Sequence, residues 1–415
     1  MIKNIKVGAS IRTFHCYTEC PDVAGTELKT VINSALNQLN KLLDDTYSVF
    51  KTRYLSVTCP MLYVYICEQK IDEINAFTDG TDIFLSAASM IGMHDYIEER
   101  LNTEKANGEK LVPEGLEVTS SVRIYKNILE IIVAHELTHI WHGHRPWKKA
   151  VLRAGASSTV TYDDILSEQI TIDDTCNDRS DEEIAKDIYN LQSRNGILIV
   201  ENQTDLNYIQ QILEMDADCG AMSIVLSQLQ REINEVMRKN LVGTLEEDKR
   251  EIRSIISYHS YLLGLLVGAS GLMCGYFDNQ REGKPFDRLG DLLRSSHPIP
   301  AVRFYKMHAT LLSTIHEFYT EEKVANILLS QIDAFAIDIF AHDDEGKDIR
   351  NCFWVPVQTK EAQEFIVCLE RGWNMIRDSL QQYALLTIPN KYTEDDLQID
   401  DASCWYDRHG NLIIS

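Results

Sequence analysis

The five residues His135-Glu136-Leu137-Thr138-His139 form the clearest chemical pattern in the sequence. On an α-helix, residues four apart lie one turn apart on the same face, so both imidazoles can reach one metal ion. The glutamate after the first histidine can then take a proton from a water molecule bound to that ion. Two satisfied core histidines are the alternative, but unpartnered imidazoles would be costly in so apolar a helix. The pattern therefore predicts a metal site with His135 and His139 as ligands and Glu136 as general base.

The third ligand is predicted to come from a separate helix. A motif that continued along the same segment would need glycine at position 142 and histidine at position 145, but the chain has His142 and Arg145 there. The sequence EMDAD at 214–218 offers carboxylates on a second predicted helix instead. We therefore expect Glu214 to complete the ligand set.

Asp218 lies one helical turn after Glu214 and can accept the ring N–H of a liganding histidine, for which we expect His135. An acidic, solvated helix face is the alternative interpretation of this segment. The apolar residues interspersed with the carboxylates argue for a partly buried helix, where paired carboxylates need a cation. We expect one Zn²⁺ ion, with a water molecule in the fourth position of a tetrahedral site.

Four separate signatures occur in one order along the chain. They are Ile74-Asn75-Ala76-Phe77, HELTH with His144, EMDAD, and Ser295-Ser296-His297-Pro298 with Arg303. In this order they resemble the NAF, HExxHxxxxH, ExxAD and SxHPxxxxR motifs of gluzincin metallopeptidases of the HtpX and CAAX-prenyl-protease type. The resemblance spans roughly residues 60–305, and the insertion at 145–203 and the C-terminal hundred residues lie outside it.

The resemblance implies roles for further residues. Asn75, Ala76 and Phe77 would form the edge strand of the active-site sheet, where a substrate peptide could add as an extra strand. His297 and Arg303 would lie near the metal as catalytic residues that stabilise the oxyanion or steady the ligands. The alternative for this segment is a plain helix start, with Pro298 in the first turn and Arg303 on the surface.

The sequence also departs from that family, whose members often carry transmembrane helices before the catalytic helix. The apolar stretch 261–277 is 17 residues long and would span only about 26 Å as a helix, short of a bilayer core of about 30 Å. We expect a buried core helix there, with a membrane-embedded protease as the alternative. A looser resemblance is to bacterial phage-exclusion peptidases, which act on a host protein inside the cell.

Composition indicates an ordinary soluble protein. The 415 residues carry a net charge of −23, which disfavours nucleic acid and anionic membranes as partners. No secretory signal is evident, and the ten cysteines form no CxxC pair. We therefore expect a cytoplasmic protein with reduced thiols.

The elements that must position these residues suggest an α+β, mainly α fold. In this fold the HExxH and ExxAD helices pack beside a small mixed sheet whose edge strand lines the active-site cleft. The expected elements are helices at 26–45, 121–144 (with Ser120 or Ser121 as N-cap), 204–240 and 310–384, strands at 61–67, 74–77 and 82–86, a loop at 102–118 and a hairpin at 404–415.

Two regions are expected. Residues 1–310 form the metallopeptidase domain with an acidic insertion at 145–203, and residues 311–415 form a helical region of unknown role. The expected function is a zinc-dependent endopeptidase of an intracellular protein, selective or controlled by an activating or inhibiting partner. A catalytically silent, zinc-stabilised interaction protein is the main alternative.

Overall fold

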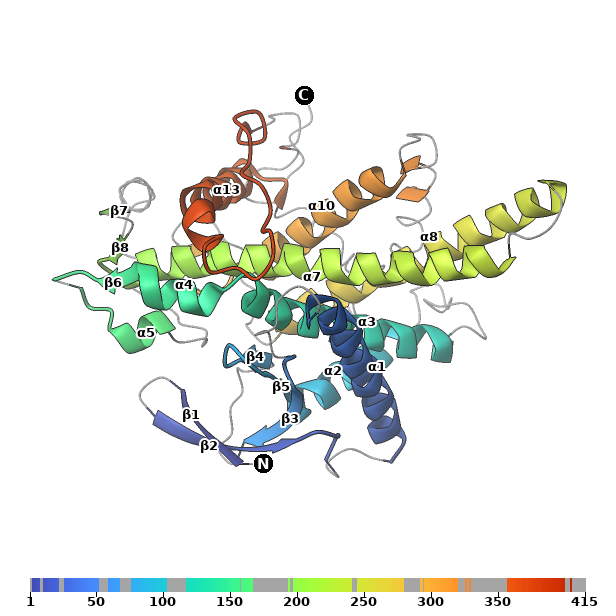
Figure 1. Cartoon of the computed structure of the whole chain (residues 1–415), viewed down its shortest axis with the longest axis horizontal. Helices are drawn as coiled ribbons and strands as arrows, with labels where there is room; N and C mark the ends of the chain where they lie inside the picture. The colour runs from blue at the N-terminus through green and yellow to red at the C-terminus, as the bar shows by residue number, and fades with distance from the viewer. Residues whose placement is uncertain are drawn as a thin grey trace.

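The computed structural model describes residues 2–7, 10–21, 26–51, 59–67, 76–102, 117–156, 158–166, 193–194, 197–240, 245–279, 292–293, 295–319, 325–326, 328–329, 357–399 and 404. Helix α7 (Gln203–Asn240) is the longest and runs across the molecule (Figure 1). Helices α3 (Glu117–Trp141), α8 (Leu245–Asn279) and α10 (Pro300–Phe318) pack against it. The fold is α+β and mainly α, as the sequence predicts.

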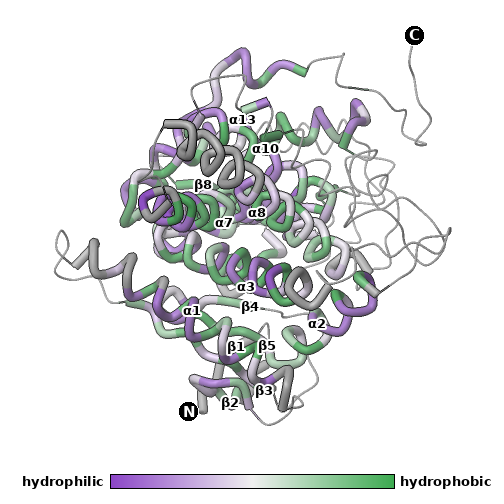
Figure 2. The backbone as a smooth tube through the Cα atoms, turned by 90° about the vertical axis from the view of Figure 1, so that its right-hand side faces the viewer, coloured by the Kyte–Doolittle hydropathy of each residue, from purple (hydrophilic) through white to green (hydrophobic). Residues whose placement is uncertain are grey.

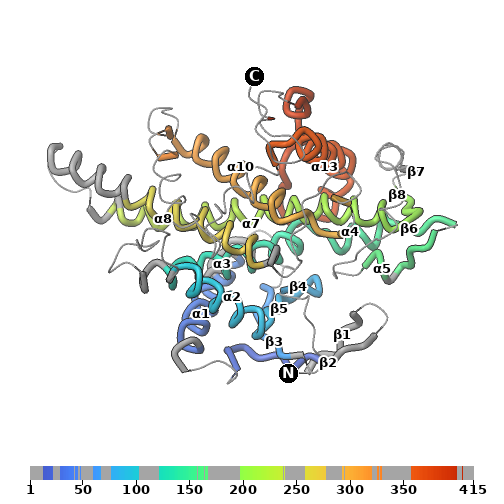
Figure 3. Tube along the Cα trace, turned by 180° about the vertical axis from the view of Figure 1, so that it is seen from behind, coloured from blue at the N-terminus to red at the C-terminus, as the bar shows by residue number. Residues whose placement is uncertain are grey.

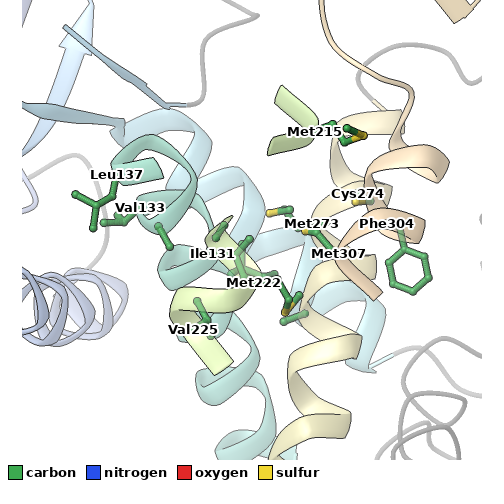
Figure 4. Packing of buried hydrophobic residues seen from close by; sticks show 14 of the residues in the cluster. Ile131, Val133, Leu137, Met215, Met222, Val225, Met273, Cys274, Phe304 and Met307 are labelled. Atoms are coloured by element: carbon green, nitrogen blue, oxygen red, sulfur yellow. The ribbon is translucent and has the colours of Figure 1, made fainter. Parts of the chain in front are cut away.

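These four helices share one apolar core that is rich in sulfur. Met222 of α7 lies between Ile131 of α3 and Met273 of α8, and Met307 of α10 lies beside Met273 (Figure 4). Methionine side chains are flexible and fill irregular spaces between helices that cross at different angles. Figure 2 shows the hydrophobic segments of these helices gathered in the middle of the molecule.

A five-stranded mixed sheet lies on the side of α3 away from α10 (Figures 1 and 3). Its strand order is β1-β2-β3-β5-β4, with β3 and β5 parallel and the other pairs antiparallel. The strands are β1 (Ile2–Val7), β2 (Ser10–Tyr17), β3 (Leu62–Cys67), β4 (Ala76–Thr78) and β5 (Ile83–Ser86). The edge strand β4 packs against α3, the helix that bears the HELTH segment.

Side-chain alternation gives this sheet two apolar faces. Leu62 and Val64 of β3, with Ile83 and Leu85 of β5, face the main core, which includes helices α1 (Thr26–Lys51) and α2 (Ala87–Asn102). The other face carries a small aromatic cluster. Its members are Phe14, Cys16, Tyr65, Phe77 and Phe84.

Two smaller units flank the long helices. After α4 (His144–Val151), the chain forms a three-stranded sheet from β6 (Leu152–Ala154), β7 (Ser193–Arg194) and β8 (Ile197–Val200), with α5 (Tyr162–Leu166) beside it. Helix α13 (Lys360–Leu380) packs on α7, where the Tyr208 hydroxyl donates to the carbonyl of Cys368 at 2.7 Å.

The segment after α13 closes the turn between α3 and α4. Leu385 N–H donates to the Trp141 carbonyl at 2.7 Å, and Trp147 Nε1 donates to Ser379 Oγ at 2.9 Å. Gly143 in this turn has φ of 69°, and an added Cβ would lie 2.3 Å from the Tyr383 carbonyl oxygen. Only glycine fits that backbone conformation and that close approach together.

Several predicted elements are confirmed, including the helices begun at 26 and 204 and the strands at 61–67 and 82–86. The prediction that α3 begins after Ser120 or Ser121 is wrong, because the helix extends back to Glu117 and both serines are helical. Serine is tolerated inside helices at a small cost. The β1–β2 hairpin was not predicted, and residues 145–166 and 197–200 are more regular than expected.

The apolar stretch 261–277 belongs to the buried helix α8, as expected. Among the described residues, no helix is long and apolar enough to cross a membrane. The seven cysteines whose side chains the structure describes are free. Most of the predicted loop at 102–118 and of the hairpin at 404–415 lies outside the described residues.

Helices α3 and α7 come unusually close at the level of the HELTH and EMDAD segments. An added Cβ at Gly220 of α7 would lie 2.5 Å from Cγ2 and 2.6 Å from Oγ1 of Thr138 on α3. Glycine at this position therefore allows the two helices that carry the predicted ligands to approach one another.

We expect Gly220→Ala to lower the free energy of unfolding by about 1–3 kcal/mol, because the added methyl overpacks the helix contact. This loss should outweigh the gain of about 1 kcal/mol in helix propensity. Urea denaturation measures the change. The double variant Thr138→Ala/Gly220→Ala, which removes both crowded atoms of the threonine, should recover most of the loss. An alanine variant more stable than the wild type would contradict the close approach.

Candidate metal centre

Three buried side chains on α3 and α7 bring their donor atoms together. His135, His139 and Glu214 are 8%, 9% and 5% exposed. The two Nε2 atoms lie 3.1 Å apart, His135 Nε2 lies 3.1 Å from Glu214 Oε2, and His139 Nε2 lies 3.5 Å from Glu214 Oε1. A tetrahedral site with metal–ligand bonds of 2.0–2.1 Å has edges of about 3.3 Å. The three separations are close to this edge length, and the two contacts with Glu214 are made by different oxygens of its carboxylate.

The chemistry of these donors also fits a metal ion. Glu214 Oε2 is buried and accepts no hydrogen bond from the described part of the chain, although His135 Nε2 lies beside it. A buried carboxylate oxygen without a donor is costly unless a cation neutralises it. This His-His-Glu group could therefore hold a metal ion.

An aspartate and an arginine fix the ring of His135 through its Nδ1 atom. His135 Nδ1 lies 2.9 Å from Asp218 Oδ1, and Arg303 donates to both oxygens of Asp218, from Nε at 2.8 Å and Nη2 at 2.7 Å. With its Nδ1 proton donated to Asp218, neutral His135 presents an unprotonated Nε2 to the other donors. The Asp218 contact therefore selects the tautomer that a metal ligand requires.

Charges around the centre favour a cation at this point. Burial disfavours the charged imidazolium, yet the neighbouring carboxylates of Asp218 and Glu214 raise the pKa of His135 to about 10, so a metal ion that binds this ring displaces a proton from it. The pKa of Glu214 lies well below its ordinary value despite burial, because His297 and His139 face it. Burial lowers the pKa of His139 well below its ordinary value. An ionised Glu214 and a neutral His139 are the protonation states that metal ligation needs.

A second buried group adjoins the first through His139. His139 Nδ1 lies 2.7 Å from His144 Nδ1, and His144 Nε2 lies 2.9 Å from Asp216 Oδ2. His142 Nδ1 reaches the same Asp216 oxygen at 2.5 Å. By the positions of their donor atoms, His142, His144 and Asp216 could also hold a metal ion.

The remaining predicted site residues occupy distinct places. Glu136 is buried on α3 directly after His135. His297 Nε2 lies 3.4 Å from Glu214 Oε2, and Arg303 binds Asp218. The alternative of a surface arginine after Pro298 is wrong, because the Arg303 side chain is only 13% exposed and binds Asp218, and α10 begins at Pro300.

Only part of the predicted NAF segment lies in the described edge strand of the sheet. Ala76 and Phe77 lie in the edge strand β4, but the Phe77 ring stacks on Phe84 with ring centres 4.8 Å apart, inside the aromatic cluster. Among the described strands, β4 is the last in the sheet order and pairs only with β5. Asn75 lies outside the described residues.

Sequence reasoning missed the part played by Asp216 and His142. The structure shows that α7 is buried on every side from Thr204 to Asp218, which the polar residues of this segment did not indicate. On such a helix each carboxylate requires a partner, whichever way it points.

No family model matches the chain, and no curated protein or solved structure matches it either. The gluzincin resemblance therefore remains a prediction that rests on the motifs and on the geometry described above.

We expect Glu214→Ala to abolish most metal binding, because it removes the only carboxylate ligand of the centre. Saturating divalent metal at 1,000 times Kd should stabilise the wild type by about 4 kcal/mol and raise its Tm, with no comparable shift in the variant. Glu232→Ala removes a carboxylate from the same helix outside the centre and serves as the control. Equal metal-induced shifts in both variants would exclude this centre.

We expect Arg303→Lys to weaken metal binding about 10- to 100-fold, because lysine keeps the charge but loses the two-pronged contact that fixes Asp218 behind His135. Competition with a chelating indicator measures Kd. If Arg303 instead acts directly on the substrate, the variant will keep the wild-type Kd and lose turnover alone.

Proposed function

We propose that the protein is a zinc-dependent endopeptidase. The observation that carries this proposal is the convergence of His135 Nε2, His139 Nε2 and the Glu214 carboxylate at 3.1–3.5 Å, with Glu136 buried directly after the first predicted ligand. Two imidazoles and one carboxylate with an open fourth position are typical of catalytic zinc. A purely structural zinc site is closed by four protein ligands and has no use for a neighbouring general base.

Zinc bound at these residues would lower the pKa of a water molecule and polarise the carbonyl of a peptide bond. Glu136 would accept the proton of the attacking water and then deliver it to the leaving amine. Asp218 and Arg303 would keep the His135 ring in its ligand orientation during this cycle. Each of these roles uses a residue that the fold holds in a buried position.

His297 is the residue best placed to stabilise the developing oxyanion. The sequence indicated His297 and Arg303 for this role, and Arg303 binds Asp218 through its Nε and Nη2 atoms. His297 Nε2 faces the donor group at 3.4 Å from Glu214, and Ser296 Oγ lies 3.2 Å from its Nδ1. An imidazole N–H aimed at this point can donate to negative charge formed beside the metal.

The substrate would be an extended segment of protein. Within the described part of the chain, β4 pairs with β5 on one side only, so its other edge can accept a peptide as an additional strand. Main-chain pairing of this kind is tolerant of sequence, so selectivity would come from side-chain pockets or from a controlling partner. We expect an intracellular protein substrate and a restraint on the free enzyme.

We expect Glu136→Gln to retain the metal and to lose peptidase turnover by a factor of about 10² or more, because glutamine cannot accept the proton. A proteome-wide search for new protein termini should find cleavages in cells that express the wild type and none with the variant. Glu130→Gln, also on α3 but outside the centre, is the matched control and should cleave normally.

Full cleavage by Glu136→Gln would refute the mechanism. Stoichiometric zinc with no cleavage by the wild type, alone or with cell extract added, would favour the silent interaction protein instead.

A further inference from the structure

The second buried group meets the metal centre at one contact between two histidine rings. His139 and His144 face one another through their Nδ1 atoms at 2.7 Å. Two ring nitrogens at this distance share one proton, because two N–H groups would repel and two lone pairs would not attract. Which Nδ1 atom carries that proton depends on the contact that each ring makes through its other nitrogen, Nε2.

The contacts of Asp216 determine where the protons of these rings lie. His142 Nδ1 and His144 Nε2 both approach the same oxygen of Asp216, at 2.5 Å and 2.9 Å. An ionised carboxylate only accepts hydrogen bonds, so both of these nitrogens donate. Neutral His144 then has its proton on Nε2 and a lone pair on Nδ1. His139 must therefore carry its proton on Nδ1, which leaves its Nε2 free for the metal.

The same proton positions are incompatible with a second metal ion at His142, His144 and Asp216. That ion would take the Nε2 lone pair of His144 and move the ring proton to Nδ1, where it would face the proton of a metal-bound His139. One neutral ring would then have to lose its only remaining proton. The two distances to Asp216 are also shorter than the edge of about 3.3 Å in a tetrahedral site and suit hydrogen bonds instead.

We propose that Asp216 and His144 are positioning residues that hold His139 in its metal-binding tautomer, and that the proton shared by His139 and His144 limits the two donor groups to one metal ion in total. This inference rests on the metal centre of the proposed function, but not on peptidase activity. Asp218 contacts His135 directly, whereas Asp216 acts on His139 through the intervening imidazole of His144.

The test is zinc binding to the purified full-length protein in competition with a chelating indicator. The wild type should bind one equivalent. His144→Leu removes the acceptor and should raise Kd about 10- to 100-fold. His144→Asn places an amide oxygen near the position of Nδ1 and should recover part of that loss. His308→Leu, at a buried histidine outside the centre, should bind as the wild type does.

Nitrogen-15 spectra of the histidine rings supply a readout that altered packing alone would not move. In the zinc-bound wild type, His139 should be protonated at Nδ1 and His144 at Nε2. Two equivalents of bound zinc, reduced to one by His142→Ala, would overturn the single-ion limit. Wild-type Kd in His144→Leu would overturn the positioning role while the metal centre stands. Absence of zinc binding in the wild type would overturn both the centre and this inference.

Discussion

Burial of charge between α3, α4 and α7 is the constraint on which this structure depends. Four histidines and three carboxylates meet there away from water, together with the guanidinium of Arg303. Unpaired, each charged group would cost several kcal/mol. Pairing them requires close helices, which Gly220 permits, and a tight turn, which Gly143 permits. A cation held by the first group would complete the compensation.

The two imidazole ligands are supported in different ways. His135 rests directly on a carboxylate, and its surroundings favour a positive charge. His139 rests on another imidazole, and burial keeps it neutral. His135 must therefore give up a proton before its Nε2 can bind a metal ion, whereas His139 is already neutral. The EMDAD segment serves both supports, since alternate carboxylates of one helix leave it in different directions.

Local patterns predicted much of this arrangement, since helical spacing alone places His135, His139 and Glu214 on faces that can meet. The hydrogen-bond partner of each histidine ring was harder to predict from the sequence. Whether Asp216 or Asp218 faces a given histidine depends on the rotation of α3 against α7, which no local pattern encodes. The β1–β2 hairpin was missed because its first strand, IKNIKV, is polar at an edge and lacks the apolar run of a buried strand.

The closure of the α3–α4 turn by the segment after α13 sets an order of events during synthesis. A nascent chain that has emerged as far as α10 already carries every donor atom and both Asp218 and Arg303. It still lacks Leu385 and Tyr383, which bind and enclose the turn between His142 and His144. On the ribosome, the support of His139 is therefore the last part of the centre to be secured, and an incomplete chain has ligands without their full framework.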